Sequence, residues 1–577
     1  MKRMTRGMTR AVPPGKLRLI AQAAMLAACA PALAAPTINL GEEATLDFNA
    51  TVNYGVAMRT KAPSAALVNG PVGAAGLPST INADDGDRNF KRHSLIENRF
   101  SALLEGDLKY QNLGLFARAS MFYDNVYNRR NDNNAPATVN HGGDPQSFTE
   151  GARDYAGRRA RMLDVYAYGA FTPGDTKLNL RVGQQVVQWG EALYFPNIAG
   201  AQAPADATKS NVAGAEVKDI LLPTGQVSAQ WALTPSLSVM AYYQYKYKPT
   251  EVSPAGTYFS YADMIGPGAD RIYTMANPLL ANPATAALPG LPMVLAAMRG
   301  PDIRPADRGQ FGVGARFRPA AGTELGLYYL RYHDKNPSVQ MNFGIATLYP
   351  GLPQAGIPAI TSAALPPAYQ FLPTTYQVKY FDGIHLAGAT FSTQVAGISL
   401  AGELSHRSGA PVLVNTPAGP TASRSASWQG QVSAIKAIEK TPLADSMILV
   451  AEIGVHRVGS VDALTIAGAR YSQLAATRSS WGYVVGPTLS YQNVFGGWDM
   501  DMPITFQHLV RGVPAVAGSF GALTGKGDKR LSVGVTFRYL SNLEVGAAYN
   551  AFLGGANAAL RPLGDRNYLS FNVKYRF

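Results

Sequence analysis

Apolar and polar residues alternate along most of this chain with a period of two. Residues 45–59 read TLDFNATVNYGVAMR, in which every second residue from Leu46 to Met58 is apolar and most residues between them are polar. Successive side chains of a β-strand point to opposite faces, whereas a helix, with 3.6 residues per turn, would scatter both sets around its surface. The pattern therefore predicts a strand with one apolar and one polar face.

The same alternation recurs to the last residue and predicts about 18 strands in all. Residues 99–110 and 113–123 repeat it on either side of Gln111 and Asn112, which is typical of a hairpin with a two-residue turn. The remaining strands are predicted at 160–171, 177–188, 225–234, 236–248, 309–318, 323–333, 382–393, 397–406, 427–438, 445–456, 483–493, 498–508, 529–540, 542–552 and 568–577.

The connections between these strands alternate between short turns and long loops. The loops cover 60–93, 127–159, 189–224, 249–308, 334–381, 407–426, 457–482, 509–528 and 553–567. This arrangement is typical of an antiparallel, up-and-down transmembrane barrel of the outer-membrane type, with 16–18 strands, short periplasmic turns and long extracellular loops. Unpaired backbone groups are costly in hydrocarbon, so we expect the last strand to close the barrel by pairing with the first. A soluble sandwich, propeller or solenoid would not separate short from long connections so regularly.

The N-terminus has the features of an export signal. Residues 1–18 are basic and carry no acid, an apolar run follows, and an Ala-x-Ala site ends at Ala34. We expect residues 1–35 to be removed, which leaves one barrel domain over 36–577. An alternative is the segment LAAC at 26–29, which is similar to a lipoprotein signal in which Cys29 becomes acylated. Cleavage after Ala34 or Ala35 would leave no cysteine, and hence no disulfide.

Composition and charge exclude other classes of protein. Removing the six basic residues of 1–18 from the 51 Lys and Arg leaves 45 against 38 Asp and Glu, a formal charge of +7. This charge is too small and too dispersed for a nucleic-acid-binding surface. The seven histidines show no metal-ligand spacing and there is no Gly-x-Ser-x-Gly motif; His406, beside Ser405 and Ser408, is the nearest approach to a catalytic arrangement. We expect neither enzymatic activity nor a cofactor.

If the apolar parity faces lipid, the opposite parity faces the lumen, and it is rich in charges of both signs. Around 18 strands leave an aqueous lumen. The charged side chains would then either form a wall network that stabilises the barrel or line a constriction that selects solutes. The lumen-facing candidates are Arg99, Glu105, Arg118, Arg181, Arg316, Glu403, Glu452 and Arg538.

An acidic motif stands in the first long loop. It reads NADDGDRNF, and its acidic residues are Asp84, Asp85 and Asp87. Carboxylates are oxygen ligands suited to Ca²⁺, but the spacing differs from that of an EF-hand, and His93 stands where a closing bidentate acid would be sought. We therefore expect an exposed loop, paired to Arg88 or another basic group, rather than a metal site.

A second motif begins the third long loop. The stretch VGQQVVQWGEALYFPNIAG at 182–200 contains Trp189 and Glu191 near the presumed outer end of a strand. Two readings stay open: residues 189–224 fold inward as a plug, or they form a packed corner. The chain ends on the alternating strand NYLSFNVKYRF, and its terminal Phe577 is similar to the signal that the barrel assembly machinery reads.

Together with GELSHRSGAPV at 402–412, the closing YRF and the chain length, these motifs resemble a family of proteobacterial outer-membrane barrels catalogued as a domain of unknown function. The resemblance implies an outer-membrane location in a Gram-negative cell and a role beside export machinery for hydrophobic molecules or lipids. Two hypotheses follow. The first is a porin-like transport barrel for small or amphipathic molecules, in contact with outer-membrane lipids; the second is a plugged barrel that docks a periplasmic or lipoprotein partner.

Overall fold

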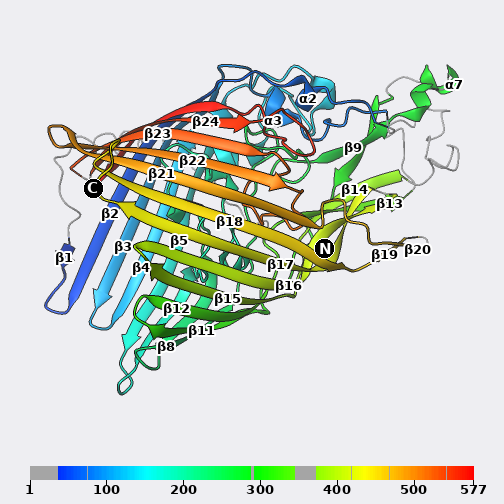
Figure 1. The fold of residues 1–577 in the computed structure, drawn as a ribbon. Helices are drawn as coiled ribbons and strands as arrows, with labels where there is room; N and C mark the ends of the chain where they lie inside the picture. Colours follow the sequence, from blue (N-terminus) through cyan, green and yellow to red (C-terminus); the bar gives the residue numbers. More distant parts are fainter. Residues whose placement is uncertain are drawn as a thin grey trace, which may run out of the picture.

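The computed structural model describes residues 37–577 except 74–75, 282, 288–290, 345–371, 418, 467 and 541. Within that part of the chain, 18 antiparallel strands each pair with the next in sequence and the last pairs with the first (Figure 1). The predicted fold, a closed all-β barrel of the outer-membrane type, is confirmed. Among the described residues, no helix is both long and apolar enough to span a membrane. The predicted signal at 1–35, including Cys29, lies outside the described residues.

The barrel strands are β2 (Ala44–Arg59), β3 (Leu95–Tyr110), β4 (Leu113–Asp124), β5 (Arg158–Phe171), β6 (Lys177–Gln185), β7 (Thr224–Ala232), β8 (Leu237–Gln244), β11 (Gln310–Ala320), β12 (Thr323–Tyr332), β15 (Ile384–Val395), β16 (Ile398–Thr416), β17 (Gly419–Ile438), β18 (Ser446–Val461), β21 (Ser479–Phe495), β22 (Trp498–Arg511), β23 (Lys529–Tyr539), β24 (Leu543–Leu553) and β25 (Tyr568–Arg576). A short β1 (Thr37–Asn39) pairs with β2 beside the ring.

The C-terminal strand closes the barrel as predicted. β25 pairs antiparallel with β2, in a register that places Tyr54 opposite Val573, and the backbone N–H of Phe577 donates to the carbonyl of Ala50 at 2.9 Å. No backbone edge is left open at this seam, which is the condition for a sheet in hydrocarbon.

The two faces of the wall differ as the alternation predicts. Large apolar side chains of one parity are exposed on the outside, for example Leu327 (67%) and Leu569 (47%). Neighbours of the other parity point inward and are buried, for example Tyr328 and Leu330 on β12. Because an isolated soluble protein rarely exposes a continuous apolar surface, this outer face fits lipid.

Short turns join the strands at one rim and long loops at the other (Figure 1). β15 and β16, for example, are joined by Ala396 and Gly397, both at positive φ (50° and 73°), which matches the twist of a tight hairpin. The prediction of a loop at 407–426 is wrong. β16 continues to Thr416 and β17 begins at Gly419, so the two strands form one extended hairpin. Its inner residues, such as Val412 and Val414, are buried, so the strand continues past the Gly-Ala-Pro sequence at 409–411.

The long loops carry small elements of their own. Strands β9 (Arg271–Ala276), β10 (Val294–Arg299), β13 (Ser338–Gly344) and β14 (Leu372–Lys379) form a separate sheet, and β19 (Leu464–Ile466) pairs with β20 (Ala469–Tyr471). The short helices are α2 (Ala65–Val68), α3 (Asp85–Arg88), η1 (Val126–Asn128), η2 (Pro136–Thr138), α4 (Glu150–Ala152), η3 (Arg153–Gly157), α5 (Ile198–Gln202), η4 (Ala207–Lys209), α6 (Val217–Ile220), η5 (Pro278–Ala281) and α7 (Pro283–Ala286).

Candidate functional site

The connection between β6 and β7, residues 186–223, lies inside the barrel, and we name it the inward segment. Its first part, residues 187–203, is held by an inner-face carboxylate of β16. Glu403 accepts hydrogen bonds from the backbone N–H groups of Glu191 (2.8 Å) and Ile198 (3.2 Å). These contacts join residues more than 200 positions apart in the sequence.

A second inner-face carboxylate, Glu452 on β18, holds the same part of the segment. It accepts hydrogen bonds from three successive backbone N–H groups, those of Leu193 (3.1 Å), Tyr194 (2.6 Å) and Phe195 (3.0 Å). Hydrogen bonds to a charged acceptor are roughly twice as strong as neutral ones. Glu403 and Glu452 thus position the segment against the wall.

Apolar packing fixes this part further. The indole of Trp189 lies 5.0 Å from the ring of Tyr242 on β8 and 5.8 Å from that of Tyr328 on β12, and its exposed fraction is only 6%. Ile198 is fully buried in the same cluster. We name residues 187–203 the anchor, because polar and apolar contacts both hold it to the inner wall.

The second part of the segment contacts the opposite side of the ring, and we name residues 207–219 the latch. The backbone N–H of Ala213 donates to Glu97 on β3 (3.2 Å), and the amide of Asn53 on β2 donates to the carbonyl of Ala213 (3.0 Å). The inward segment therefore crosses the lumen from β8, β12, β16 and β18 to β2, β3 and β25.

Ion pairs hold the tip of the latch. One carboxylate oxygen of Glu216 lies 2.9 Å from the Lys574 ammonium and 2.8 Å from the Arg576 guanidinium, both on β25. The Lys218 ammonium lies 3.1 Å from Glu105 on β3. Glu216, Lys218 and Arg576 are each about a third exposed, so these pairs are partly solvated.

Hydrogen bonds from two bases set the charge of Glu216. Burial acts to raise its pKa, but the hydrogen bonds from Lys574 and Arg576, with their charges, lower the pKa from 4.5 to about 2. The latch carboxylate is therefore ionised over the whole neutral range.

The base of the latch is tied to another long loop by a compact ionic group. Glu251, in the β8–β11 loop, pairs with Arg159 (2.7 Å) and Arg161 (2.8 Å) of β5, and Arg161 also pairs with Asp206 (2.6 Å). These groups lie just before the latch and fix the point from which it extends.

Small polar cavities lie between the latch and the wall. One of about 50 Å³ is lined by the charged groups of Arg99, Lys209 and Lys574, among others. A second of about 30 Å³, which Glu97 and Asp124 help to line, also touches Val212 of the latch. Since a water molecule occupies about 30 Å³ in the liquid, each has room for about one or two waters. The contact between the latch and the wall therefore includes small polar gaps.

Three other lumen-facing candidates, Arg99, Glu105 and Arg118, form ion pairs within the wall. Arg118 lies 2.5 Å from Asp164 and 3.9 Å from Glu105, and Arg99 lies 3.2 Å from Asp124. All five are inner-face residues of β3, β4 and β5. This sector is a paired ionic wall beside the latch.

The remaining three candidates are arginines on β6, β11 and β23. Arg316 pairs with Glu324 (3.4 Å), Arg538 contacts Asp501, and Arg181 is exposed on β6. A role of these arginines in selecting solutes stays a prediction.

The expectation of an exposed acidic loop is wrong. Asp84, Asp85 and Asp87 are at most 2% exposed, because other loops cover α3. Part of the pairing is as expected, since Asp84 lies 2.6 Å from Arg88. Asp87 pairs with two buried arginines distant in sequence, of which Arg59 lies 2.7 Å away.

The arrangement of Ser405 and His406 does not suit catalysis. Ser405 points inward and hydrogen-bonds Asn197, whereas His406 points outward and stacks on Trp428 at 4.7 Å. Adjacent strand residues face opposite sides of the wall, so the two side chains do not meet.

Sequence reasoning placed Glu403 and Glu452 in the lumen but not their partners. Their cross-strand neighbours, such as Gln431 opposite Glu403 and Ser433 opposite Glu452, are not basic. An unpaired inner carboxylate is itself a signal that something inside the barrel donates to it.

Comparison with known proteins gives a family but no close relative. A family model described as "Protein of unknown function (DUF1302)" matches residues 16–577. No match was found among curated proteins.

Matches were also found among solved structures, and three of them have TM-scores of 0.33 to 0.40. The Acinetobacter baumannii protein OccAB4 has a TM-score of 0.40 at 9% identity over 93% of this chain and 99% of its own. The A. baumannii outer membrane channel DcaP has a TM-score of 0.33 at 9% identity, over 94% and 100%. Pseudomonas aeruginosa OccK2 (OpdF), solved with glucuronate, has a TM-score of 0.37 at 9% identity, over 92% and 98%.

Proposed function

This chain belongs to the DUF1302 family of proteins of unknown function, and we propose that it is an outer-membrane channel for small amphipathic molecules, opened by movement of the latch. The observation that carries the proposal is a closed 18-strand ring crossed by a segment that is packed on one side and ion-paired on the other. A ring of this size is wide enough for an aqueous lumen. The inward segment, rather than the wall, therefore sets the width of the path.

The two halves of the inward segment differ in how strongly they are held. Truncating a buried aromatic or Ile side chain typically costs about 2–5 kcal/mol, which applies to Trp189 and Ile198 of the anchor. Partly exposed ion pairs such as those of Glu216 and Lys218 are worth about 0–1 kcal/mol each. The two buried hydrogen bonds of Ala213, with Glu97 and Asn53, add about 1–3 kcal/mol each to the latch. The anchor has buried carboxylate hydrogen bonds as well as its apolar packing, so displacing the latch costs less than displacing the anchor.

The inner wall has two kinds of surface, and the latch lies on only one of them. β8, β12 and β15 have apolar inner side chains, including Met240, Leu330 and Leu386, which are buried against the anchor. β3, β4, β5 and β25 present the ionic pairs described above. A solute that passes where the latch has withdrawn would therefore meet charged groups, and the amphipathic class of cargo is proposed from the resemblance to barrels that serve export machinery for hydrophobic molecules.

Conductance in planar lipid bilayers tests the proposal. The purified barrel is compared with a variant whose latch, residues 207–219, is replaced by a Gly-Ser linker of equal length, and uptake of amphipathic solutes is followed in liposomes. We expect single-channel currents from both, with a larger and steadier current from the variant. An insulating wild type and an insulating variant would refute a channel.

A plugged docking barrel is the second candidate, and one observation favours it. Inner-face residues on both sides of the lumen, such as Glu452 and Lys574, are at most 5% exposed, as in a filled interior. The partner would be a periplasmic or lipoprotein component of an export system. A deletion strain tests the export role: unchanged sensitivity to, and growth on, hydrophobic compounds would count against it.

A further inference from the structure

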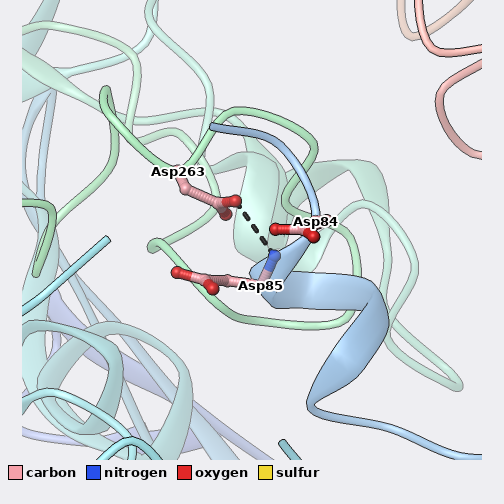
Figure 2. Close-up of side chains that lie close together, drawn as sticks. All are labelled: Asp84, Asp85 and Asp263. Atoms are coloured by element: carbon pink, nitrogen blue, oxygen red, sulfur yellow. Dashed lines mark hydrogen bonds between the residues drawn. The ribbon is translucent and has the colours of Figure 1, made fainter. Parts of the chain in front are cut away.

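Three acidic side chains from two long loops meet at one point beyond the strands. Asp84 and Asp85 begin α3 in the β2–β3 loop, and Asp263 lies in the β8–β11 loop, as Figure 2 shows. One carboxylate oxygen of each lies within 4.8 Å of the others. All three residues are at most 2% exposed.

Each carboxylate uses one oxygen and leaves the other without a partner. The Arg88 guanidinium donates to Oδ2 of Asp84 (2.6 Å). The backbone N–H of Asn140 donates to Oδ2 of Asp85 (2.9 Å), and the backbone N–H of Asp85 donates to Oδ2 of Asp263 (3.0 Å). Oδ1 of Asp84, of Asp85 and of Asp263 has no hydrogen-bond partner among the residues that the structure describes. Leaving a buried acceptor unsatisfied costs about 1–3 kcal/mol, more if it is charged, so three together call for a ligand.

The charges at this point do not balance, unlike those of the neighbouring network. Nearby, the buried Asp87 and Asp565 are matched by the equally buried Arg59 and Arg566. At the three-aspartate cluster, Arg88 is the base in direct contact, and it contacts Asp84.

Burial has a second consequence for these carboxyls. Burial, with repulsion from neighbouring carboxylates, raises the pKa of Asp84 to about 6 and that of Asp263 to about 7. The pKa of Asp85 is raised in the same direction by burial and by Asp263. The cluster thus gains from taking up positive charge, which either protons or a metal ion would supply.

We propose that Asp84, Asp85 and Asp263 bind a divalent cation, with Ca²⁺ the ion that fits best. An all-oxygen set of carboxylates selects hard cations over zinc or copper. Calcium–oxygen distances are about 2.3–2.6 Å, so two oxygens bound to one ion stand at most about 5 Å apart. One oxygen of each carboxylate lies within 4.8 Å of the others, which satisfies this limit. Asn140 lies in the β4–β5 loop and has an unpartnered buried Oδ1 of its own.

A cation at this point would tie the outer loops to one another. The β2–β3 and β8–β11 loops supply the carboxylates, and the β4–β5 loop contacts Asp85 through Asn140. The site is separate from the inward segment, so it does not depend on whether the barrel conducts.

Calcium binding to the full-length, detergent-purified barrel tests the proposal. Protein stripped with EDTA is titrated with CaCl₂ by calorimetry, alongside Asp263→Asn and Asp85→Asn. The matched control is Asp144→Asn, an exposed aspartate of the β4–β5 loop. We expect a single site in the wild type and the control, with affinity weakened about tenfold or more in both cluster variants. No saturable binding to the wild type, or equal affinity in the cluster variants, would overturn the proposal.

A measurement on the wild-type protein tests the same proposal without variants, which could fail to fold. Limited proteolysis of the β2–β3 loop is compared in CaCl₂ and in EDTA, with MgCl₂ as a further arm. We expect slower cleavage in calcium than in EDTA, and a weaker effect of magnesium, which demands shorter bonds. Identical cleavage in all three solutions would refute a cation that joins the loops.

Discussion

Glu216 is the residue at which the latch meets the closing strand. Its carboxylate lies between Lys574 and Arg576, and Glu544 of β24 shares both of these bases, at 3.5 Å and 2.9 Å. The two bases therefore keep a carboxylate partner when Glu216 withdraws. This exchange lowers the cost of releasing the latch, because neither cation is left unpaired.

Removing the charge of Glu216 should favour the open channel. In Glu216→Gln the side chain still accepts a hydrogen bond, but the ion pairs are lost, which costs the closed state about 1 kcal/mol and raises the ratio of open to closed channels about fivefold. Single-channel recording measures this ratio. The control is Glu150→Gln, an ion-paired glutamate of an outer loop. An unchanged ratio in Glu216→Gln would show that the latch does not gate.

The same carboxylate predicts a pH dependence. The pKa of Glu216 is about 2 in the closed state, against an ordinary 4.5 when it is free, and Lys574, Arg576 and Lys218 are the cations that face it. A lowered carboxyl pKa stabilises the closed latch fully above about pH 4.5, and this contribution is lost as the pH falls toward 2. The contribution of Glu216 to open-channel occupancy should therefore be constant from pH 5 to 8, and occupancy should rise as the pH falls below about 4.5. Glu216→Gln should lack that rise, and an identical acid response in both proteins would contradict this assignment.

Among the elements, the barrel strands are the part that the sequence predicts well. Period-two alternation depends on the wall having a lipid face and a lumen face, so stretches such as residues 45–59 reveal their strands locally. The hairpin of β16 and β17 is the exception, since Pro411 and the glycines near it resemble a turn although the alternation continues through Val412 and Val414.

The candidate site is less predictable because its contacts are not local. The alternation predicted that the charged side chains of Glu403 and Glu452 face the lumen, but their hydrogen-bond partners lie more than 200 residues earlier in the chain. In the same way, the acidic motif at 82–90 gives no hint of Asp263, which lies 178 positions after Asp85. Pairing of distant loops is set by tertiary structure, which the local pattern does not encode.

The division of the inward segment into anchor and latch predicts two rates of backbone exchange. The N–H groups of Leu193, Tyr194 and Phe195 donate to one buried carboxylate of the wall. In the latch, the N–H of Ala213 donates to the wall, and N–H groups such as those of Lys209, Val212 and Ala215 donate to carbonyls three residues earlier in local turns. In hydrogen–deuterium exchange followed by mass spectrometry, peptides from 187–203 should exchange about tenfold or more slowly than those from 207–219. Equal protection of both peptides would contradict a separately mobile latch.

In the whole molecule, Phe577 at the seam between β25 and β2 should affect assembly of the barrel in the membrane much more than its stability. Phe577 contributes one backbone hydrogen bond to β2, and losing it should cost about 1 kcal/mol, far too little to open an 18-strand barrel. Deletion of Phe577 should therefore leave refolding in detergent intact while lowering the amount of folded barrel in the outer membrane, as read from heat-modifiable gel mobility. Normal membrane levels of the truncated chain would refute the terminal aromatic as an assembly signal.

If movement of the latch opens the barrel, a reversible cross-link between the latch and the wall should hold the barrel closed. A Cβ at Gly55 on β2 would lie 3.3 Å from the Cβ of Ala213 on the latch, close to the separation in a disulfide, and residues 36–577 contain no other cysteine. The Glu97 carboxylate must shift to admit the new side chain, so Gly55→Cys alone is the control.

Single-channel current of the Gly55→Cys, Ala213→Cys barrel is recorded oxidised and after reduction. We expect a closed, low-conductance state of the oxidised double variant and restored openings after reduction, with no response to reductant in the Gly55→Cys control. Equal currents in the oxidised and reduced double variant would contradict it.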